Sequence, residues 1–212
     1  GHGQSDGKRG HIRSYAITDE MIDSLLDQCS KTFPGIPLFL YGHSLGGGMV
    51  LDYMLRKNPP VKGAIVTSPW LKLSFEPEKS KIRLAGIMKN ILPSLVQSSG
   101  LVVDHLSRDR EVVEKYKKDP LVHGLISVSL FHSAMTAASR SLHNASSLKK
   151  PLLLMHGTDD RICSSEGSRE FAEKTPLAEL RLWEGAYHEL HNDLCRHEVF
   201  DAIRNWLETK LS

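Results

Sequence analysis

The strongest constraint on the fold is the junction at Ser44, where an apolar run passes directly into helix-forming sequence. Residues 36–41 are Ile-Pro-Leu-Phe-Leu-Tyr, and Gly-His-Ser-Leu-Gly-Gly-Gly follows. This order predicts a strand, a sharp turn that carries a serine, and a helix. We expect the crowded turn to leave no room for a Cβ at Gly42 or Gly46. Gly47 and Gly48 should let the helix lie close to the sheet. A serine in such a turn, called a nucleophile elbow, exposes its hydroxyl as a candidate nucleophile.

Strands and helices alternate along the rest of the chain. Continuous apolar runs, typical of parallel strands buried on both faces, cover residues 61–67 and 151–157, and a fourth strand is predicted over 179–183. Helices are predicted over residues 18–33, 44–57, 165–174 and 197–211. This alternation indicates an α/β fold with a mostly parallel sheet and flanking helices.

The interval between the second and third strands is far longer than a crossover needs. We therefore expect a partial core formed by residues 1–69 and 148–212, and a helical lid over residues 70–147. An apolar stripe at helical spacing lies within this insertion and comprises Leu84, Ile87, Met88, Ile91, Leu92 and Leu95. The stripe either packs on the domain below it, or lines the entrance to a lipid-binding cleft or touches a membrane surface. Residues 108–118 are charge-rich and predict a solvated helix.

Composition excludes several classes of protein. The 212 residues are 40% hydrophobic and 25% charged, as in an ordinary single globular domain. The net charge is +2 and the basic residues are dispersed, so we expect no nucleic-acid partner. The three cysteines, Cys29, Cys163 and Cys195, lack metal-ligand spacing and are interpreted as free thiols in a reducing compartment, with a surface pair as the alternative. A cytoplasmic or peripherally membrane-associated protein is expected, although a chain that begins at Gly1 gives no information about a signal peptide.

Candidate partners for Ser44 follow the third and fourth strands. The third strand ends in His-Gly-Thr-Asp-Asp, so that Asp159 and Asp160 both lie where an acid is needed, and His188 follows the fourth strand. The order serine, acid, histidine suits activation of a hydroxyl by an imidazole that a carboxylate orients. The residues alone leave the choice between the two aspartates open, since a loop aspartate is often only a turn former. His188 and His191 are three residues apart and lie in a loop, which argues against a zinc site. We expect no metal and no cofactor.

Six segments resemble the monoacylglycerol lipase family of α/β hydrolases, and the likeness covers essentially the whole chain. They are residues 1–7, 42–47, 107–108, 119–121, 156–163 and 184–191. The resemblance implies that Ser44 is the nucleophile, Asp160 the acid and His188 the base, and that the amide of Leu45 is one oxyanion donor. It also implies that Cys163 lies near the active site and Tyr116 near the polar end of the pocket. The substrate-binding candidates are His43, Tyr116, Ile87, Leu92 and Cys163.

This sequence departs from the family pattern at its start. In the family, roughly the first quarter of the chain precedes the Gly-His-Gly-x-Ser loop and supplies several strands and a second oxyanion donor. We therefore expect upstream residues, because the nucleophile strand would otherwise be an exposed apolar edge. Losing one oxyanion donor costs on the order of 3 kcal/mol of transition-state stabilisation.

The sequence thus predicts an α/β-hydrolase fold and a serine hydrolase that cleaves monoacylglycerols or similar single-chain lipid esters through an acyl-serine. The expected partners are the lipid ester and, transiently, a membrane surface that the lid touches. One alternative is a lysophospholipase or general carboxylesterase with the same three residues. The other, from a different class, is a catalytically inactive binding protein on the same fold.

Overall fold

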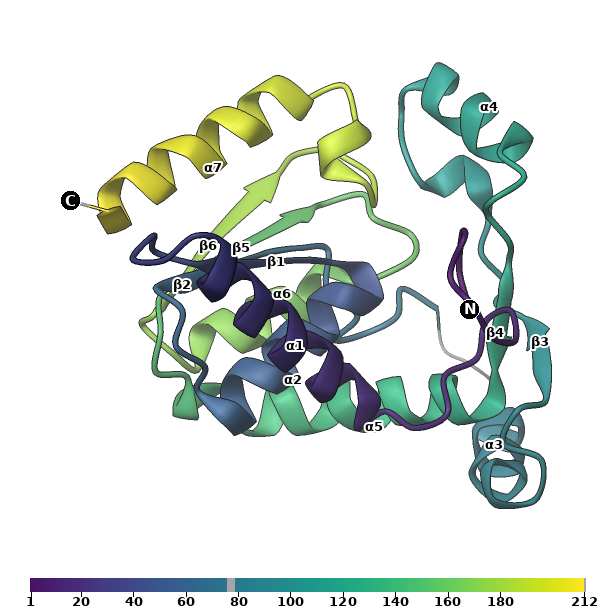
Figure 1. Cartoon of the computed structure of the whole chain (residues 1–212). Helices are drawn as coiled ribbons and strands as arrows, with labels where there is room; N and C mark the ends of the chain where they lie inside the picture. The colour runs from purple at the N-terminus through teal and green to yellow at the C-terminus, as the bar shows by residue number, and fades with distance from the viewer. Residues whose placement is uncertain (76–78, 212) are drawn as a thin grey trace.

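The centre of the molecule is a parallel sheet of four strands in the order β1-β2-β5-β6 (Figure 1). The computed structural model describes residues 1–75 and 79–211, apart from the side chains of residues 79–82, 84 and 85. The strands are β1 (Phe39–His43), β2 (Gly63–Thr67), β5 (Leu152–Gly157) and β6 (Ala178–Trp183). All of their pairings are parallel, so their carboxyl ends meet at one edge of the sheet. The predicted α/β architecture and the four predicted strands are confirmed.

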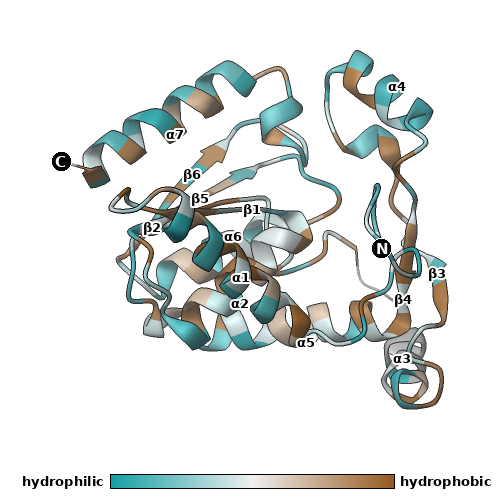
Figure 2. Cartoon of the chain, viewed as in Figure 1, coloured by the Kyte–Doolittle hydropathy of each residue, from teal (hydrophilic) through white to brown (hydrophobic). Residues whose placement is uncertain are grey.

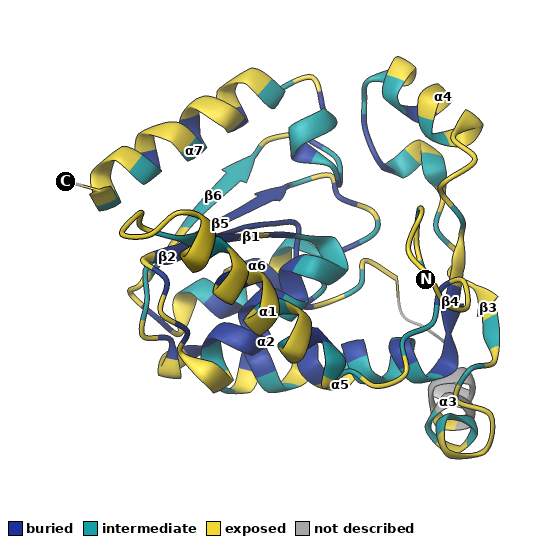
Figure 3. Ribbon diagram, viewed as in Figure 1, coloured by how far each residue is buried: buried dark blue, intermediate teal, exposed yellow. Residues whose placement is uncertain are grey.

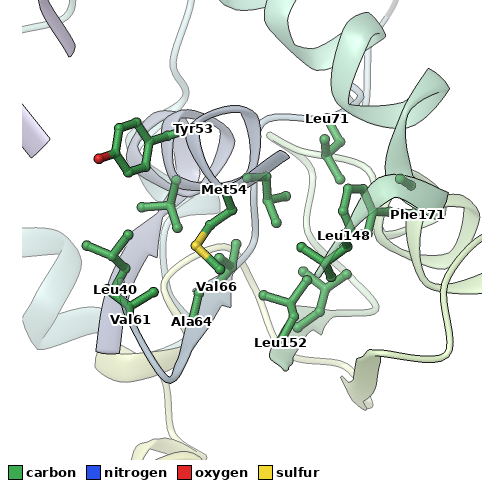
Figure 4. Close-up of a cluster of buried hydrophobic side chains, with 14 of the residues drawn as sticks. Leu40, Tyr53, Met54, Val61, Ala64, Val66, Leu71, Leu148, Leu152 and Phe171 are labelled. Carbon is green, nitrogen blue, oxygen red and sulfur yellow. The ribbon is translucent and has the colours of Figure 1, made fainter. Parts of the chain in front are cut away.

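Helices cover both faces of this sheet (Figure 1). One face carries α1 (Ile17–Thr32), α2 (Ser44–Lys57), α5 (Val128–His143) and α6 (Ser165–Glu173), and the other carries α7 (Arg196–Leu211). Val66 and Leu154 pack with Met54 and Phe171 on the first face, within the cluster that Figure 4 shows. The alternate strand residues Ile65, Leu153 and Met155 pack against Trp206 of α7 on the second face. Burial on both faces explains why these strands are continuous apolar runs.

The region around α1 and β1 is less buried than the sequence predicts. The predicted amphipathic helix forms, and Leu26 reaches the core, but the side chains of Met21 and Leu25 are 63% and 53% exposed. Figure 3 shows the exposed outer side of α1. On β1, Tyr41 is 49% exposed, in contrast to the expected burial on both faces. The reason is that β1 is an edge strand among the described residues, with β2 as its one neighbour.

The segment from 70 to 147 contains more structure than the sequence predicts. Before α5 it forms α3 (Lys79–Ile91), β3 (Val96–Ser98), the short helix η1 (Val103–His105), α4 (Arg110–Lys118) and β4 (Leu125–Ser127). The antiparallel pair of β3 and β4 was not predicted, because three-residue strands show no period, and α5 was not predicted either. Figure 2 shows hydrophobic residues on β3 and β4. Leu142 of α5 packs in the main core, and the predicted division at residue 147 stays a prediction.

The predicted apolar stripe is largely exposed where the structure describes it. Ile87, Ile91 and Leu92 are 54%, 64% and 51% exposed, whereas the side chain of Leu84 lies outside the described residues. The N-terminal segment runs beside β4, where the Ser127 amide donates to the Gly10 carbonyl at 2.7 Å. Among the described residues, no helix combines the length and apolar character that a membrane crossing requires.

Candidate active site

The turn at Ser44 has the strained geometry that the sequence predicts. Ser44 joins β1 to α2 with a φ of +53°, a left-handed conformation that non-glycine residues rarely adopt. The Ser44 carbonyl accepts a hydrogen bond from the Trp70 amide at 2.9 Å, which holds the turn against the chain that follows β2. Leu45 follows at the N-terminus of α2, where free amides and the helix dipole favour negative charge.

The glycines around Ser44 differ in how strictly they are required. A Cβ at Gly42 would lie 2.6 Å from the Gly46 carbonyl oxygen, so no side chain fits there. A Cβ at Gly47 would lie 3.0 Å from the side chain of Val66, and a Cβ at Gly48 would lie 3.0 Å from the Trp70 carbonyl oxygen. The predicted close packing of helix on sheet is therefore confirmed. The prediction for Gly46 was wrong, because a Cβ there would meet no atom of the described residues within 4 Å outside its own helix turn.

This difference gives a matched pair of variants. Gly42→Ala is expected to lower the free energy of unfolding by about 2–3 kcal/mol, because the added methyl group overlaps the backbone of α2. Gly46→Ala should change it by less than about 1 kcal/mol, since alanine also favours the helix. Urea denaturation of both variants measures the two values. Equal destabilisation would contradict this account of the turn.

Asp160 and His188 meet Ser44 at the carboxyl edge of the sheet. His188 follows β6, and its Nε2 lies 2.9 Å from the Ser44 Oγ, while its Nδ1 lies 2.7 Å from the Asp160 Oδ2. Because a carboxylate oxygen accepts, the Nδ1 of His188 carries the proton and Nε2 is free to accept from the serine hydroxyl. A hydroxyl, an imidazole and a carboxylate in this chain can generate an alkoxide-like nucleophile.

Asp160, rather than Asp159, contacts His188. The Asp160 Oδ1 accepts hydrogen bonds from the amides of Ile162 at 2.8 Å and Cys163 at 3.0 Å, and its side chain is buried. Burial alone would raise the pKa of Asp160, but hydrogen bonds from His156 and His188 outweigh it and hold the pKa well below its usual range. Asp159 is exposed at the same turn. The structure thus brings Asp160 to His188 and leaves Asp159 at the surface, while the catalytic role of Asp160 stays a prediction.

The loop that carries His188 is anchored from two sides. Ser68, with a φ of +44°, donates its hydroxyl proton to the His188 carbonyl at 2.7 Å. From the 70–147 segment, the Leu106 carbonyl accepts from the Glu189 amide at 2.8 Å. The fully buried Asp193 accepts from the Arg108 Nε at 2.7 Å. These contacts fix His188 relative to Ser44.

Two further imidazoles surround His188. The rings of His43 and His188 are 4.8 Å apart, as are those of His43 and His191. The Nδ1 of His43 lies 3.0 Å from the Thr67 Oγ1. Burial lowers the pKa of His43 and also that of His191, which keeps both rings neutral near pH 7. The ring of His43 packs against that of His188, and His43 is absent from the residues that line the adjoining cavity.

A cavity of about 470 Å³ adjoins Ser44 and Leu45. This volume lies in the range of roughly 300–1,000 Å³ that is common for small-molecule sites. Its walls are mostly apolar and include Trp70, Leu73, Leu101, Val102, Ile126, Leu130, Phe131 and Ile162, while the polar lining residues include His2, His105, Tyr116, His123 and Arg161. Of the predicted substrate-binding residues, Tyr116 and Cys163 line this cavity, and the exposed Ile87 and Leu92 do not.

Several residues that position the three central side chains were missed by the sequence interpretation. Ser68 and Asp193 act through contacts between distant segments, so no local pattern indicates them. His156 lies in the His-Gly-Thr-Asp-Asp motif, where its place four residues before Asp160 was an available signal. Ser74 donates to the Asp160 carbonyl at 2.8 Å and gave no sequence signal.

Comparison with known proteins agrees with this geometry. Residues 1–195 match the family model described as serine aminopeptidase, S33. The chain is 32% identical to an abhydrolase domain-containing protein of Dictyostelium discoideum, and the match covers 100% of this chain and 23% of that protein. It is also 32% identical to the phospholipase YtpA of Bacillus subtilis, over 96% of this chain and 80% of YtpA.

A solved structure supports the same assignment. The crystal structure of the Paleococcus ferrophilus monoacylglycerol lipase is 36% identical and superposes with a TM-score of 0.91, covering 99% of this chain and 80% of that one. The predicted α/β-hydrolase fold and the predicted resemblance are both confirmed. The chain belongs to the serine aminopeptidase S33 family of α/β hydrolases.

Proposed function

We propose that this protein is a serine hydrolase that cleaves the ester bond of monoacylglycerols or similar single-chain lipid esters. The observation that carries the proposal is the continuous chain of hydrogen bonds from Ser44 through His188 to Asp160, placed at the wall of an apolar cavity. An inactive binding protein has no need of this chain, so the geometry favours an enzyme. The assignment to carboxylic ester hydrolases agrees with the monoacylglycerol lipase and the phospholipase among the relatives.

The geometry suits acyl transfer in two steps, first acylation of Ser44 and then hydrolysis of the acyl-serine. His188 Nε2 takes the proton of Ser44 as Oγ attacks the ester carbonyl, and Asp160 stabilises the imidazolium that forms. The Leu45 amide at the start of α2 supplies one donor to the oxyanion, and a second donor outside this sequence stays a prediction. The imidazolium then protonates the departing alcohol. Water, deprotonated by His188, releases the acid from the acyl-serine.

The substrate class follows from the cavity. Its apolar walls suit one acyl chain, and its polar residues, among them Tyr116 and His123, suit a small hydroxylated head group. Burial raises the pKa of Tyr116, so its hydroxyl remains a neutral donor or acceptor near pH 7. Within this proposal Tyr116 and Cys163 contact the substrate, whereas His43 supports His188 from behind.

We also propose that residues 70–147 act as a lid that touches a membrane surface. The exposed side chains of Ile87, Ile91 and Leu92 form an apolar surface on and just after α3, which suits transient contact with lipid head groups and acyl chains. This contact would place the cavity near its substrate. A cytoplasmic or peripherally membrane-associated location is the corresponding prediction.

A second candidate is hydrolysis of single-chain phospholipids, which the similarity to the phospholipase YtpA favours. A panel of esters that varies head group and chain length separates the two. We expect kcat/KM for a long-chain monoacylglycerol to exceed that for the matching lysophosphatidylcholine by at least about tenfold, because the described lining has Arg161 as its one arginine or lysine to pair with a phosphate. The reverse order would favour the phospholipase. Absence of turnover with every ester would contradict both.

A further inference from the structure

A second histidine touches the acid of the candidate triad and has no part in the mechanism above. His156 lies near the end of β5 and is completely buried. Its Nε2 lies 3.0 Å from the Asp160 Oδ2 and 3.0 Å from the Cys163 carbonyl oxygen, and its Nδ1 lies 2.8 Å from the Ser168 Oγ of α6. Asp160 Oδ2 is therefore shared between the imidazoles of His156 and His188.

These contacts determine where His156 carries its proton. A carboxylate oxygen and a carbonyl oxygen both accept, so the Nε2 of His156 has to be the donor to both. The Ser168 hydroxyl, which is completely buried, has no other hydrogen-bond partner among the described residues. Every polar group is satisfied when the hydroxyl donates to an unprotonated Nδ1. A cationic His156 would leave the hydroxyl proton of Ser168 without an acceptor.

We propose that His156 and Ser168 form a positioning pair that holds the Asp160 carboxylate in the orientation in which Oδ2 meets His188. Ser168 donates to Nδ1 of His156 and keeps it unprotonated, and the Nε2–H of His156 fixes Asp160. With the amides of Ile162 and Cys163 on Oδ1, the carboxylate then has a donor for each of its roughly four lone-pair sites. The carboxylate therefore cannot rotate without breaking a buried hydrogen bond.

The neutral state of His156 is the functional part of this arrangement. A cation in its place would neutralise Asp160 and weaken its attraction for the imidazolium of His188. A neutral donor orients the carboxylate and leaves its single negative charge for the base. Titratable groups close to His188 and Asp160 also include His43, His191 and the buried thiol of Cys163, and among the described side chains none of these three donates a hydrogen bond to the carboxylate.

The effect on rate rests on the proposed function and can be measured with two variants of similar shape. His156→Met removes the donor, whereas His156→Gln keeps an NH₂ group that can serve both acceptors. We expect His156→Met to lower kcat by about ten- to a hundredfold with KM within about twofold, by analogy with the loss of hydrogen-bond partners that orient catalytic ligands. His156→Gln should recover most of kcat. Equal losses in the two variants, or no loss in His156→Met, would overturn the proposal.

A spectroscopic measurement on the wild-type protein tests the proposal independently of turnover. Long-range ¹H–¹⁵N correlation spectra at pH 7 should show His156 protonated at Nε2 and unprotonated at Nδ1, as its hydrogen-bond partners require. In Ser168→Ala we expect kcat to fall severalfold, because Nδ1 of His156 loses the hydroxyl that keeps it unprotonated, while Nε2 stays protonated against its two acceptors. A wild-type His156 that is cationic at pH 7, or protonated at Nδ1, would refute the positioning pair. An inactive wild type with the expected tautomer would instead refute the proposed function alone.

Discussion

Ser44→Ala is expected to lower kcat for ester hydrolysis by about 10⁴- to 10⁶-fold, because no other atom can form the acyl intermediate at this position. The Ser44 Oγ is the group that His188 Nε2 approaches at 2.9 Å, and the left-handed turn directs it to the cavity wall. Steady-state assays with a chromogenic short-chain ester measure the loss. Binding of a non-hydrolysable substrate analogue should stay within about threefold of the wild type, since the cavity itself is unchanged.

The control for this variant is Ser24→Ala, at an exposed position of α1 that does not line the cavity. It should leave kcat and KM unchanged. Residual activity of Ser44→Ala above about one hundredth of the wild type would point to a different nucleophile or to direct attack by water.

Asp160→Asn is expected to lower kcat by about 10⁴-fold while the protein stays folded. Asparagine presents an NH₂ group that can donate to the Nδ1 of His188, which would move the imidazole proton to Nε2 and prevent it from accepting the proton of Ser44. The expected loss is therefore a loss of the correct tautomer rather than of the fold. Unfolding curves and the activity assay, recorded on the same samples, separate the two.

Asp159→Asn is the matched control, because the two aspartates are neighbours in the sequence and only Asp160 contacts His188. Asp159 is exposed, and its substitution should change kcat by less than about twofold, as for most surface positions. If Asp159→Asn were the more damaging change, the acid in this site would be misassigned.

Features coded by local sequence were predictable. The strand, turn and helix around Ser44 form at the expected residues, since the glycines, the apolar run and the helix formers all act locally. The ends of β5 and β6 could likewise be located, and because the strands are parallel, Asp160 and His188 had to lie at the same edge of the sheet. The order of the three side chains along the chain was enough to indicate the chemistry.

Features that depend on contacts between distant segments were not predictable. Which of Asp159 and Asp160 contacts His188 depends on which carboxylate turns inward, where two imidazoles and two backbone amides donate hydrogen bonds to Asp160. The freedom at Gly46 depends on what lies above α2, and the exposure of Tyr41 depends on which strands flank β1. The strands β3 and β4 are too short to show a period, and their pairing is a tertiary contact.

Covalent labelling with a fluorophosphonate that carries a long alkyl chain tests the central claim most directly. The account predicts one phosphonate per molecule, located on Ser44 by peptide mass spectrometry, together with loss of labelling in Ser44→Ala. A reagent that labels another residue, or that leaves a folded wild-type protein unmodified, would show that Ser44, His188 and Asp160 do not work as a nucleophile, base and acid.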